Sequence, residues 1–240
     1  MNHKKGELYL IPTLLSKDAH DASVVPILKN AVKETHIFLV ENIRSARRFI
    51  SSLKLGLTIE DLIFYELSKR TSTDEVIQLM KSLDQGQNLA IISEAGLPCL
   101  ADPGAKAVSI AQKKGIKINP ITGPSSIFLA LIASGFNGQR FCFHGYLSID
   151  KELRKKEIKS LEKKANSSGE TQIFMETPYR NDSLLSDLLK SLGDSSFLCI
   201  ATNITADDEI IKTKSVREWK SDKPNIGKNP TMFLIGNLQA

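Results

Sequence analysis

Short apolar runs alternate with segments of helical periodicity in the first half of this chain. Four-residue runs at Leu8–Ile11, Ile37–Val40 and Leu89–Ile92 are typical of buried strands and are too short for buried helices. Segments such as 45–53 and 105–113 follow them and repeat an apolar residue every three or four positions. Strands that alternate with helices are typical of a parallel sheet. The pattern therefore predicts an α/β fold with a mostly parallel N-terminal sheet.

The remainder of the chain predicts a second unit with a mixed α/β sheet. Its expected elements are strands at 140–146, 171–176 and 197–202, helices at 151–166 and 183–192, and closing antiparallel strands at 209–214 and 231–235. The polar connection 221–230 is expected to be mobile. We place the boundary so that residues 1–120 form an N-terminal α/β domain and residues 121–240 form a C-terminal α/β domain.

Composition limits the class of protein. No run of about 18 apolar residues occurs, so no membrane span is expected. The N-terminal residues lead directly into the first strand and leave no room for the apolar core of a signal peptide. Three widely scattered cysteines fit a reducing compartment. We therefore expect a cytoplasmic protein.

The charge pattern is compatible with a nucleic-acid partner but does not require one. The net charge of +5 permits binding to a polyanion such as RNA, and it serves solubility equally well. The expected helix 151–166 is strongly basic, and both a solvated face and an RNA-contacting face are open interpretations. Its basic residues include Arg154, Lys155, Lys156, Lys159, Lys163 and Lys164. The four histidines share no metal-ligand spacing with the cysteines, so we expect no metal site.

Two loops of small residues follow expected strands and are the strongest candidates for a ligand site. The loop 93–104 combines glycines and prolines with the acids Glu94 and Asp102, and the loop 122–126 reads T-G-P-S-S. Glycine lets the backbone approach a ligand, and loops at the carboxyl ends of strands bind ligands in open α/β sheets. Ordinary strand-to-helix turns are the alternative. The common dinucleotide and P-loop signatures are absent from the sequence.

The motifs in these loops resemble those of a known family. The segment 93–104, S-E-A-G-L-P-C-L-A-D-P-G, is similar to S-D-A-G-T-P-x-x-x-D-P-G of the tetrapyrrole methylase superfamily. Within it, T-G-P-S-S resembles the P-G-P-S-A of the ribosomal RNA small subunit methyltransferase I branch. The segment 174–180, F-M-E-T-P-Y-R, is similar to that branch's F-Y-E-S-P-H-R. The order and spacing of the three motifs agree.

The resemblance implies S-adenosylmethionine as the cofactor, in a cleft between the two domains, and a homodimer. Glu41 and Arg44 stand where the branch has E-D-T-R, which implies a substrate-facing acid and base, with a surface ion pair as the alternative. We also expect a larger side chain at Gly123 to block the cofactor without disturbing the fold. The implied cofactor contacts are Ser93, Glu94, Ala95, Gly96, Pro98, Asp102, Pro103, Gly104, Gly123, Pro124, Ser125, Ser126, Met175, Glu176, Thr177, Ala201, Thr202 and Asn203.

Three segments depart from the branch, and they keep three functions open. Pro12-Thr13 stands in place of T-P-I-G-N-L, the region 66–71 lacks the branch's histidines, and 201–205 replaces an R-E-L-T-K-like stretch. The first function is a methyltransferase resembling the ribosomal RNA (cytidine-2′-O-)-methyltransferase branch. The second is a methyltransferase of the same fold that acts on a tetrapyrrole or another small acceptor. The third is an inactive paralogue that retains the cofactor cleft.

Overall fold

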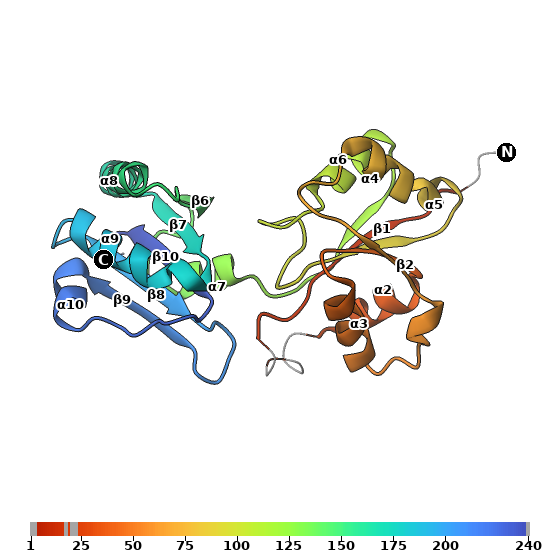
Figure 1. The fold of residues 1–240 in the computed structure, drawn as a ribbon, viewed down its shortest axis with the longest axis horizontal. Coiled ribbons are helices and arrows are strands. Elements are labelled where there is room, and N and C mark those ends of the chain that lie inside the picture. The colour runs from red at the N-terminus through yellow and green to blue at the C-terminus, as the bar shows by residue number, and fades with distance from the viewer. Residues whose placement is uncertain (1–3, 17–18, 20–23, 239–240) are drawn as a thin grey trace. The chain divides into compact units, whose positions relative to one another are not determined.

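The computed structural model describes residues 4–16, 19 and 24–238 of the 240-residue chain. The chain divides into two compact units, Met1–Pro124 and Ser125–Ala240, and each unit contains a five-stranded sheet (Figure 1). Each unit also has its own hydrophobic core. None of the helices formed by the described residues is long and apolar enough to cross a membrane.

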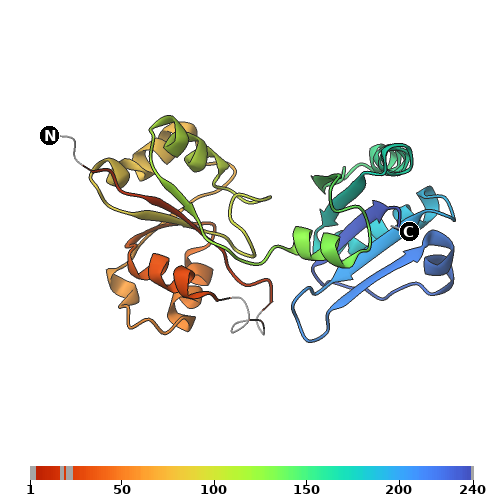
Figure 2. The same ribbon diagram turned by 180° about the vertical axis from the view of Figure 1, so that it is seen from behind.

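The N-terminal sheet is entirely parallel, in the order β3-β2-β4-β1-β5 (Figure 2). Every residue of β2 and β4 is buried, because helices cover both faces of the sheet. Burial on both faces explains why these strands read as unbroken apolar runs. The predicted parallel sheet is confirmed. Its strands are β1 (Leu8–Ile11), β2 (Ile37–Val40), β3 (Ile63–Glu66), β4 (Leu89–Ile92) and β5 (Ile118–Pro120).

Two helical layers enclose this sheet. Helices α2 and α3 pack with Ala90 and Ile92 on one face, whereas α4, α5 and α6 pack with Leu89 and Ile91 on the other. α4 starts at a capping box, in which the Ser72 hydroxyl accepts from the Glu75 N–H and the Glu75 carboxylate accepts from the Ser72 N–H. The helices of this unit are α2 (Pro26–Lys33), α3 (Ile43–Ser52), α4 (Thr73–Leu79), α5 (Lys81–Asp84) and α6 (Ala105–Lys113), with a 3₁₀ turn, η1 (Ile59–Asp61).

The C-terminal sheet is mixed, as predicted, in the order β6-β7-β10-β8-β9. β6 and β7 are parallel, β10 is antiparallel to both of its neighbours, and β9 is antiparallel to β8. Because β7 and β8 both oppose β10, their carboxyl ends meet at the same edge of the sheet. The strands are β6 (Phe141–Tyr146), β7 (Thr171–Glu176), β8 (Phe197–Thr202), β9 (Ile210–Ser215) and β10 (Thr231–Gly236).

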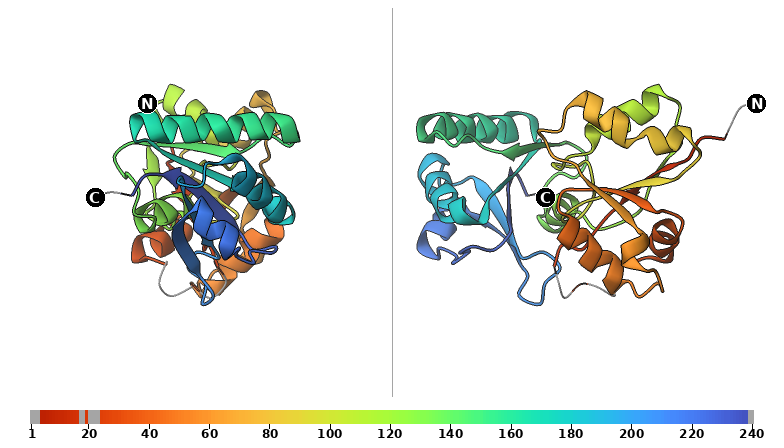
Figure 3. Two further views of the ribbon diagram at one scale, coloured as in Figure 1. Left: turned by 90° about the vertical axis from the view of Figure 1, so that its left-hand side faces the viewer. Right: turned by 45° about the vertical axis from the view of Figure 1, so that its right-hand side comes forward.

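Three helices and the sheet share the core of the C-terminal unit. Phe174, Phe233 and Trp219 lie in a cluster to which α8, α9 and α10 all contribute, and α8 extends along the unit as its longest described helix (Figure 3). α7 packs against β10. The helices are α7 (Ser126–Ala133), α8 (Lys151–Ser168), α9 (Asn181–Ser191) and α10 (Val216–Ser221), with a 3₁₀ turn, η2 (Pro178–Arg180).

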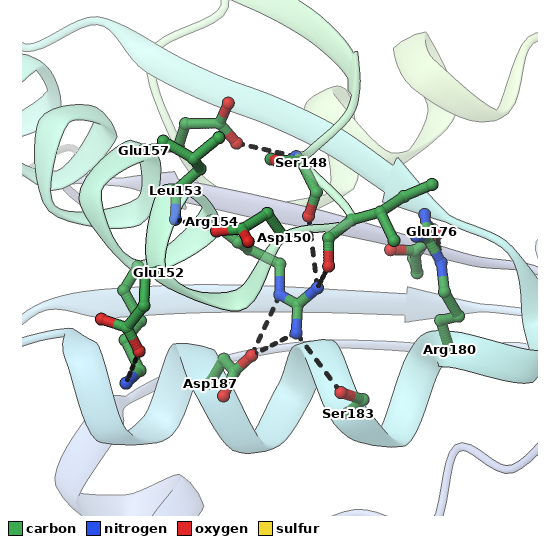
Figure 4. A network of polar contacts seen from close by, with 12 residues as sticks. Ser148, Asp150, Glu152, Leu153, Arg154, Glu157, Glu176, Arg180, Ser183 and Asp187 are labelled. Carbon is green, nitrogen blue, oxygen red and sulfur yellow. Dashed lines mark hydrogen bonds and ion pairs between the residues drawn. The ribbon is translucent and has the colours of Figure 1, made fainter.

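One basic residue of α8 is not on a solvated face. Arg154 is buried, and its guanidinium donates two hydrogen bonds to Asp187 of α9 (Figure 4). It shares the core stripe of the helix with Ile158, Leu161 and Ala165. Grouping Arg154 with the surface lysines is therefore wrong, because its position follows the apolar period of the helix and not its charge.

Candidate functional site

The topology of the N-terminal sheet places a switch point between β1 and β4. β1 and β4 are neighbours in the sheet. The chain that leaves β1 continues to β2 on one side of this pair, whereas the chain that leaves β4 continues to β5 on the other side. The helices that follow, α2 and α6, lie on opposite faces. Open α/β sheets bind ligands outside the carboxyl ends of strands at such a point. The loop 93–104 begins there.

Thr13, just after β1, fastens the start of this loop. Its backbone N–H donates to the Gly96 carbonyl at 3.0 Å, and its hydroxyl donates to the Ser93 carbonyl at 3.1 Å. The Ser93 hydroxyl donates in turn to the Gly96 carbonyl. Thr13 and Ser93 are both buried. The Ser93 side chain, a predicted cofactor contact, is thus committed to holding the loop, while Glu94 and Ala95 at its tip are exposed.

The second half of the loop holds two ordinary residues in a conformation that favours glycine. Cys99 and Ala101 both have φ of 67°, and Gly104 has φ of 126°. A Cβ at Gly104 would lie 2.7 Å from Cys99 Sγ. Glycine is therefore required there both by the positive φ and by the close approach of the sulfur. Left-handed backbone at residues other than glycine is costly and clusters at functional sites. The conformation presents Asp102 and Pro103 between two strained positions.

Three carboxyl groups interact at this edge of the sheet. Burial, the charge of Glu41, a hydrogen bond between the two carboxyls and the charge of Glu94 together raise the pKa of Asp102 to about 7. Burial and the charge of Glu94 also raise the pKa of Glu41. Asp102 Oδ2 is buried and has no hydrogen-bond partner among the described residues. Glu41 and Asp102 therefore hold their protons more tightly than isolated carboxyls do.

Glu41 and Arg44 do not form the surface ion pair that was the alternative to a functional role. Glu41 directly follows β2 and belongs to the carboxyl cluster. Arg44 lies in the first turn of α3, is exposed, and has no carboxylate partner in the part of the chain that the structure describes. The acid of this predicted pair is therefore integrated into the candidate site, whereas the base points to solvent.

Gly123 closes the carboxyl end of β5 against β1. A Cβ at Gly123 would lie 2.2 Å from Pro12 Cγ and 2.4 Å from Pro12 Cβ. Side chains cannot approach so closely, and overpacking of this kind destabilises a fold. The expectation that a larger residue here would leave the fold intact is therefore wrong. A substitution at Gly123 perturbs the packing of β1 on β5 before it reports on any ligand.

Residues 124–126 join the two units. Pro124 is the last residue of the N-terminal unit, and Ser125 precedes the first turn of α7 with an extended backbone. The Ser125 side chain forms no capping hydrogen bond with that helix. The first amides of α7 are therefore not capped by this hydroxyl.

The predicted cofactor contacts at the ends of β7 and β8 lie at matching positions on either side of β10. Glu176 and Thr202 both pair with Thr231 of β10, and Met175 and Ala201 both pair with Met232. The carboxyl ends of β7 and β8, with Thr177 and Asn203 following them, are thus separated by one strand. Asn203 adopts left-handed backbone, with φ of 51°. Residues that are about 26 positions apart in sequence therefore form one polar edge.

A buried network underlies this edge. Glu176 Oε1 accepts hydrogen bonds from Arg180 Nε at 3.0 Å and from Arg180 Nη2 at 2.6 Å (Figure 4). It also accepts one from the Thr177 N–H at 2.6 Å. Asn181 Nδ2 donates to the Asn229 carbonyl at 2.7 Å. Glu176 Oε2 and Asn181 Oδ1 are buried acceptors without a partner among the described residues. Buried acceptor atoms without a hydrogen-bond partner are uncommon in folded proteins, so these two oxygens are candidates for contact with a ligand's donor.

Sequence reasoning missed four residues of these two edges: Pro12, Thr13, Asn181 and Thr231 act here without being predicted as contacts. Pro12 and Thr13 directly follow an expected strand, which is a signal of position. Strand register places Thr231 at the edge of the C-terminal sheet, and the start of α9 places Asn181 there. No local sequence pattern shows either position. His144 Nε2 lies 2.8 Å from Gln172 Oε1, at hydrogen-bond distance. Within residues 4–16, 19 and 24–238, no group of three or more His, Cys, Asp or Glu side chains is arranged so that it could hold a metal ion.

Solved structures share this two-unit architecture. The crystal structure of the methyltransferase CobJ matches 97% of this chain and 94% of its own, with a TM-score of 0.62 and 16% sequence identity. At that identity the likeness concerns the fold. Parallel and mixed sheets in sequence, with glycine-rich loops at the carboxyl edge of the first, thus define a fold that is used by methyltransferases.

Sequence comparison gives the family. The model of the family described as tetrapyrrole (corrin/porphyrin) methylases matches residues 20–219, and the chain belongs to this family. Ribosomal RNA small subunit methyltransferase I of Pasteurella multocida is 33% identical, over 98% of this chain and 80% of that protein. The protein of the same name in Escherichia coli O157:H7 is 25% identical, over 100% of this chain and 80% of its own length. The predicted family and enzyme class, a methyltransferase, are confirmed.

Proposed function

We propose that this protein transfers a methyl group from S-adenosylmethionine to ribosomal RNA of the small subunit, at a cytidine 2′-hydroxyl. The observation that carries the proposal is the similarity to ribosomal RNA small subunit methyltransferase I, which extends over 98% of the chain. The motifs at 93–104, 122–126 and 174–180 support it because they match that branch in order and spacing.

Acceptor atoms at the edge of each unit suit this cofactor. Asp102 Oδ2 in the N-terminal unit, and Glu176 Oε2 and Asn181 Oδ1 in the C-terminal unit, are buried acceptors with no partner among the described residues. S-adenosylmethionine offers ammonium, amino and hydroxyl donors, and its sulfonium is cationic. The carboxyl cluster of Glu41, Glu94 and Asp102 complements that charge and favours the cation over the neutral demethylated product. We propose that the other predicted contacts, from Ser93 to Asn203, act mainly through their backbone.

The chemistry asks little of the protein beyond alignment and proton transfer. When bound, the cofactor supplies an electrophilic methyl group. The rigid loop 93–104 holds the donor in line with the acceptor, and alignment of this kind accounts for much of the rate enhancement. Glu41 accepts the proton of the attacking hydroxyl, since the pKa of its carboxyl is raised toward the range of a useful general base. Arg44, on the same loop-to-helix turn, approaches the RNA backbone.

Calorimetric titration with S-adenosylmethionine and with its demethylated product tests the cofactor. We expect binding near one molecule per chain. Transfer of a labelled methyl group to small ribosomal subunits from a strain that lacks the modification then tests the substrate, with mass spectrometry to locate it at a 2′-hydroxyl. Transfer only to a porphyrinoid would establish the small-acceptor alternative. Binding without transfer to either would establish an inactive cofactor-binding paralogue.

We further propose a homodimer in the cytoplasm. The three cysteines are free thiols, which suits a reducing compartment. α7 buries Ile127 and Leu131 but leaves Phe128 44% exposed and Ile132 76% exposed. Two large apolar side chains one turn apart on one helix suit a subunit interface. We expect the mass from light scattering to be twice that of the chain, and to fall to one chain in Ile132→Asp. A monomeric wild-type protein would contradict this proposal.

A further inference from the structure

Tyr179 is exposed to an unusual degree for its position. Its side chain is 82% exposed, the largest value among the large apolar side chains of the described residues. It lies in η2, directly after the predicted cofactor contacts Met175, Glu176 and Thr177. Single exposed aromatic residues are common and need no explanation by themselves. Tyr179 differs from such residues because its turn is held by hydrogen bonds and because a lysine lies beside its ring.

The backbone that carries Tyr179 is held on both sides. Pro178 precedes it and fixes its own φ, and the Arg180 N–H donates to the Thr177 carbonyl at 2.9 Å. Arg180 is joined by two hydrogen bonds to Glu176, whose side chain is 0% exposed (Figure 4). An ion pair with a buried carboxylate therefore anchors a turn whose central side chain projects into solvent.

A cation stands against the ring from a separate segment. Lys228 Nζ lies 5.2 Å from the centroid of the Tyr179 ring. Lys228 belongs to the connection 221–230, which was expected to be mobile but is anchored on both sides of this lysine. Ile226 is buried in the core of the unit, and Asn181 holds the Asn229 carbonyl. The connection thus presents its lysine at a fixed place beside the ring.

We propose that Tyr179 and Lys228 form a platform that stacks an unpaired base of the RNA substrate and contacts the adjoining phosphate. Proteins bind single-stranded RNA by stacking bases on exposed aromatic rings and by placing cations along the backbone. The platform adjoins the edge that carries Met175 to Thr177, so it positions the nucleotide for methyl transfer without reacting itself. This inference rests on the proposed function, because it requires an RNA substrate.

Tyr179→Ala, Tyr179→Phe and Lys228→Ala test the platform, with Ile149→Ala as the control. Ile149 is 78% exposed and lies in the same unit, so its replacement removes comparable exposed apolar surface but no ring. The probes are a fluorescent ten-nucleotide single-stranded RNA, followed by anisotropy, and small ribosomal subunits in the methylation assay. Titration with S-adenosylmethionine checks that every variant is folded and binds the cofactor.

Tyr179→Ala should weaken binding of the RNA on the order of 10- to 100-fold and raise the KM for subunits more than it lowers kcat. Tyr179→Phe should bind within about twofold of the wild type, because it keeps the stacking face. Lys228→Ala should reduce the salt dependence of RNA binding by about one phosphate contact, whereas Tyr179→Ala should leave that slope unchanged.

Three results would overturn the platform, and they are distinguishable. If wild-type protein methylates subunits and Tyr179→Ala behaves like Ile149→Ala, the platform is wrong and the proposed function stands. If wild-type protein neither binds RNA nor methylates subunits, the proposed function fails and the platform with it. Weaker binding of a carboxylated porphyrin in Tyr179→Ala, with RNA binding unchanged, would also overturn it.

Discussion

Replacing Arg154 by alanine is expected to destabilise the C-terminal unit by roughly 3–5 kcal/mol. The side chains of Arg154 and Asp187 are only 7% and 4% exposed. The guanidinium donates to Asp187 Oδ2 from Nε at 3.0 Å and from Nη2 at 2.5 Å (Figure 4). Its Nη1 also donates to the carbonyls of Ser148 and Ile149. Alanine would leave a buried carboxylate without a partner and remove the bonds of two carbonyls.

Urea unfolding followed by tryptophan fluorescence measures this effect where it occurs. Trp219 is the single tryptophan of the chain and is buried in the core of the C-terminal unit, so its emission reports on that unit. Lys155→Ala is the matched control. It removes a neighbouring ion pair with Glu152 that lies at the surface, where such pairs contribute at most about 1 kcal/mol.

A double variant separates the charge from the packing. Arg154→Met with Asp187→Leu removes both ionic groups and keeps apolar volume, so it should recover most of the stability that Arg154→Ala loses. Equal urea midpoints for Arg154→Ala and Lys155→Ala would contradict the burial of the pair. A double variant as unstable as Arg154→Ala would show instead that the hydrogen bonds to Ser148 and Ile149 dominate.

Much of the fold could be predicted because its signals are local. Strands such as β4 are buried on both faces and therefore read as short apolar runs. The start of α4 was visible in its capping box. Arg154 was misjudged because its charge was weighed and its spacing was not. Arg154, Ile158, Leu161 and Ala165 recur at helical intervals, and this period places the arginine on the buried face.

The candidate site was predictable only where it is continuous in sequence. The glycines and prolines of 93–104 marked a special backbone, and the structure shows left-handed residues there. The partner that fixes the loop comes from elsewhere, because Thr13 follows another strand. In the C-terminal unit, Thr231 joins the polar edge only through strand register. Glu176 was expected as a cofactor contact, yet one of its oxygens accepts three hydrogen bonds within the protein. Such non-local commitments are not visible in the sequence.

Asp102→Asn is expected to stabilise the N-terminal unit above pH 7 and to weaken cofactor binding. Burial and Glu41 raise the pKa of Asp102 to about 7, against an ordinary value near 3.8. Below about pH 4 both the folded and the unfolded chain hold the proton, so the shifted pKa of Asp102 does not lower the free energy of unfolding. As the pH rises from 4 to 7, the unfolded chain loses the proton while the folded chain keeps it. The stability of the folded state therefore falls across this window and stays reduced above it.

Asparagine removes that cost because it cannot ionise. The gain at pH 8 is expected to be roughly 1–2 kcal/mol, well below the full value of a shift of about three pH units, since Asp102 is only half-buried and solvent screens it. Thermal unfolding by circular dichroism at pH 4 and pH 8 measures it. Glu60→Gln, at an exposed carboxyl on η1, is the control and should leave the stability unchanged at both pH 4 and pH 8.

The same variant should bind S-adenosylmethionine at least about tenfold more weakly at pH 8, because a carboxylate that meets a cationic ligand is lost. Binding of the neutral demethylated product should change less, and this difference isolates charge from shape. A variant that is more stable and yet binds less would show that the repulsion among Glu41, Glu94 and Asp102 is maintained for the ligand. Unchanged affinity together with increased stability would remove the carboxyl cluster from the cofactor site and leave the loop 93–104 without its proposed charge complement.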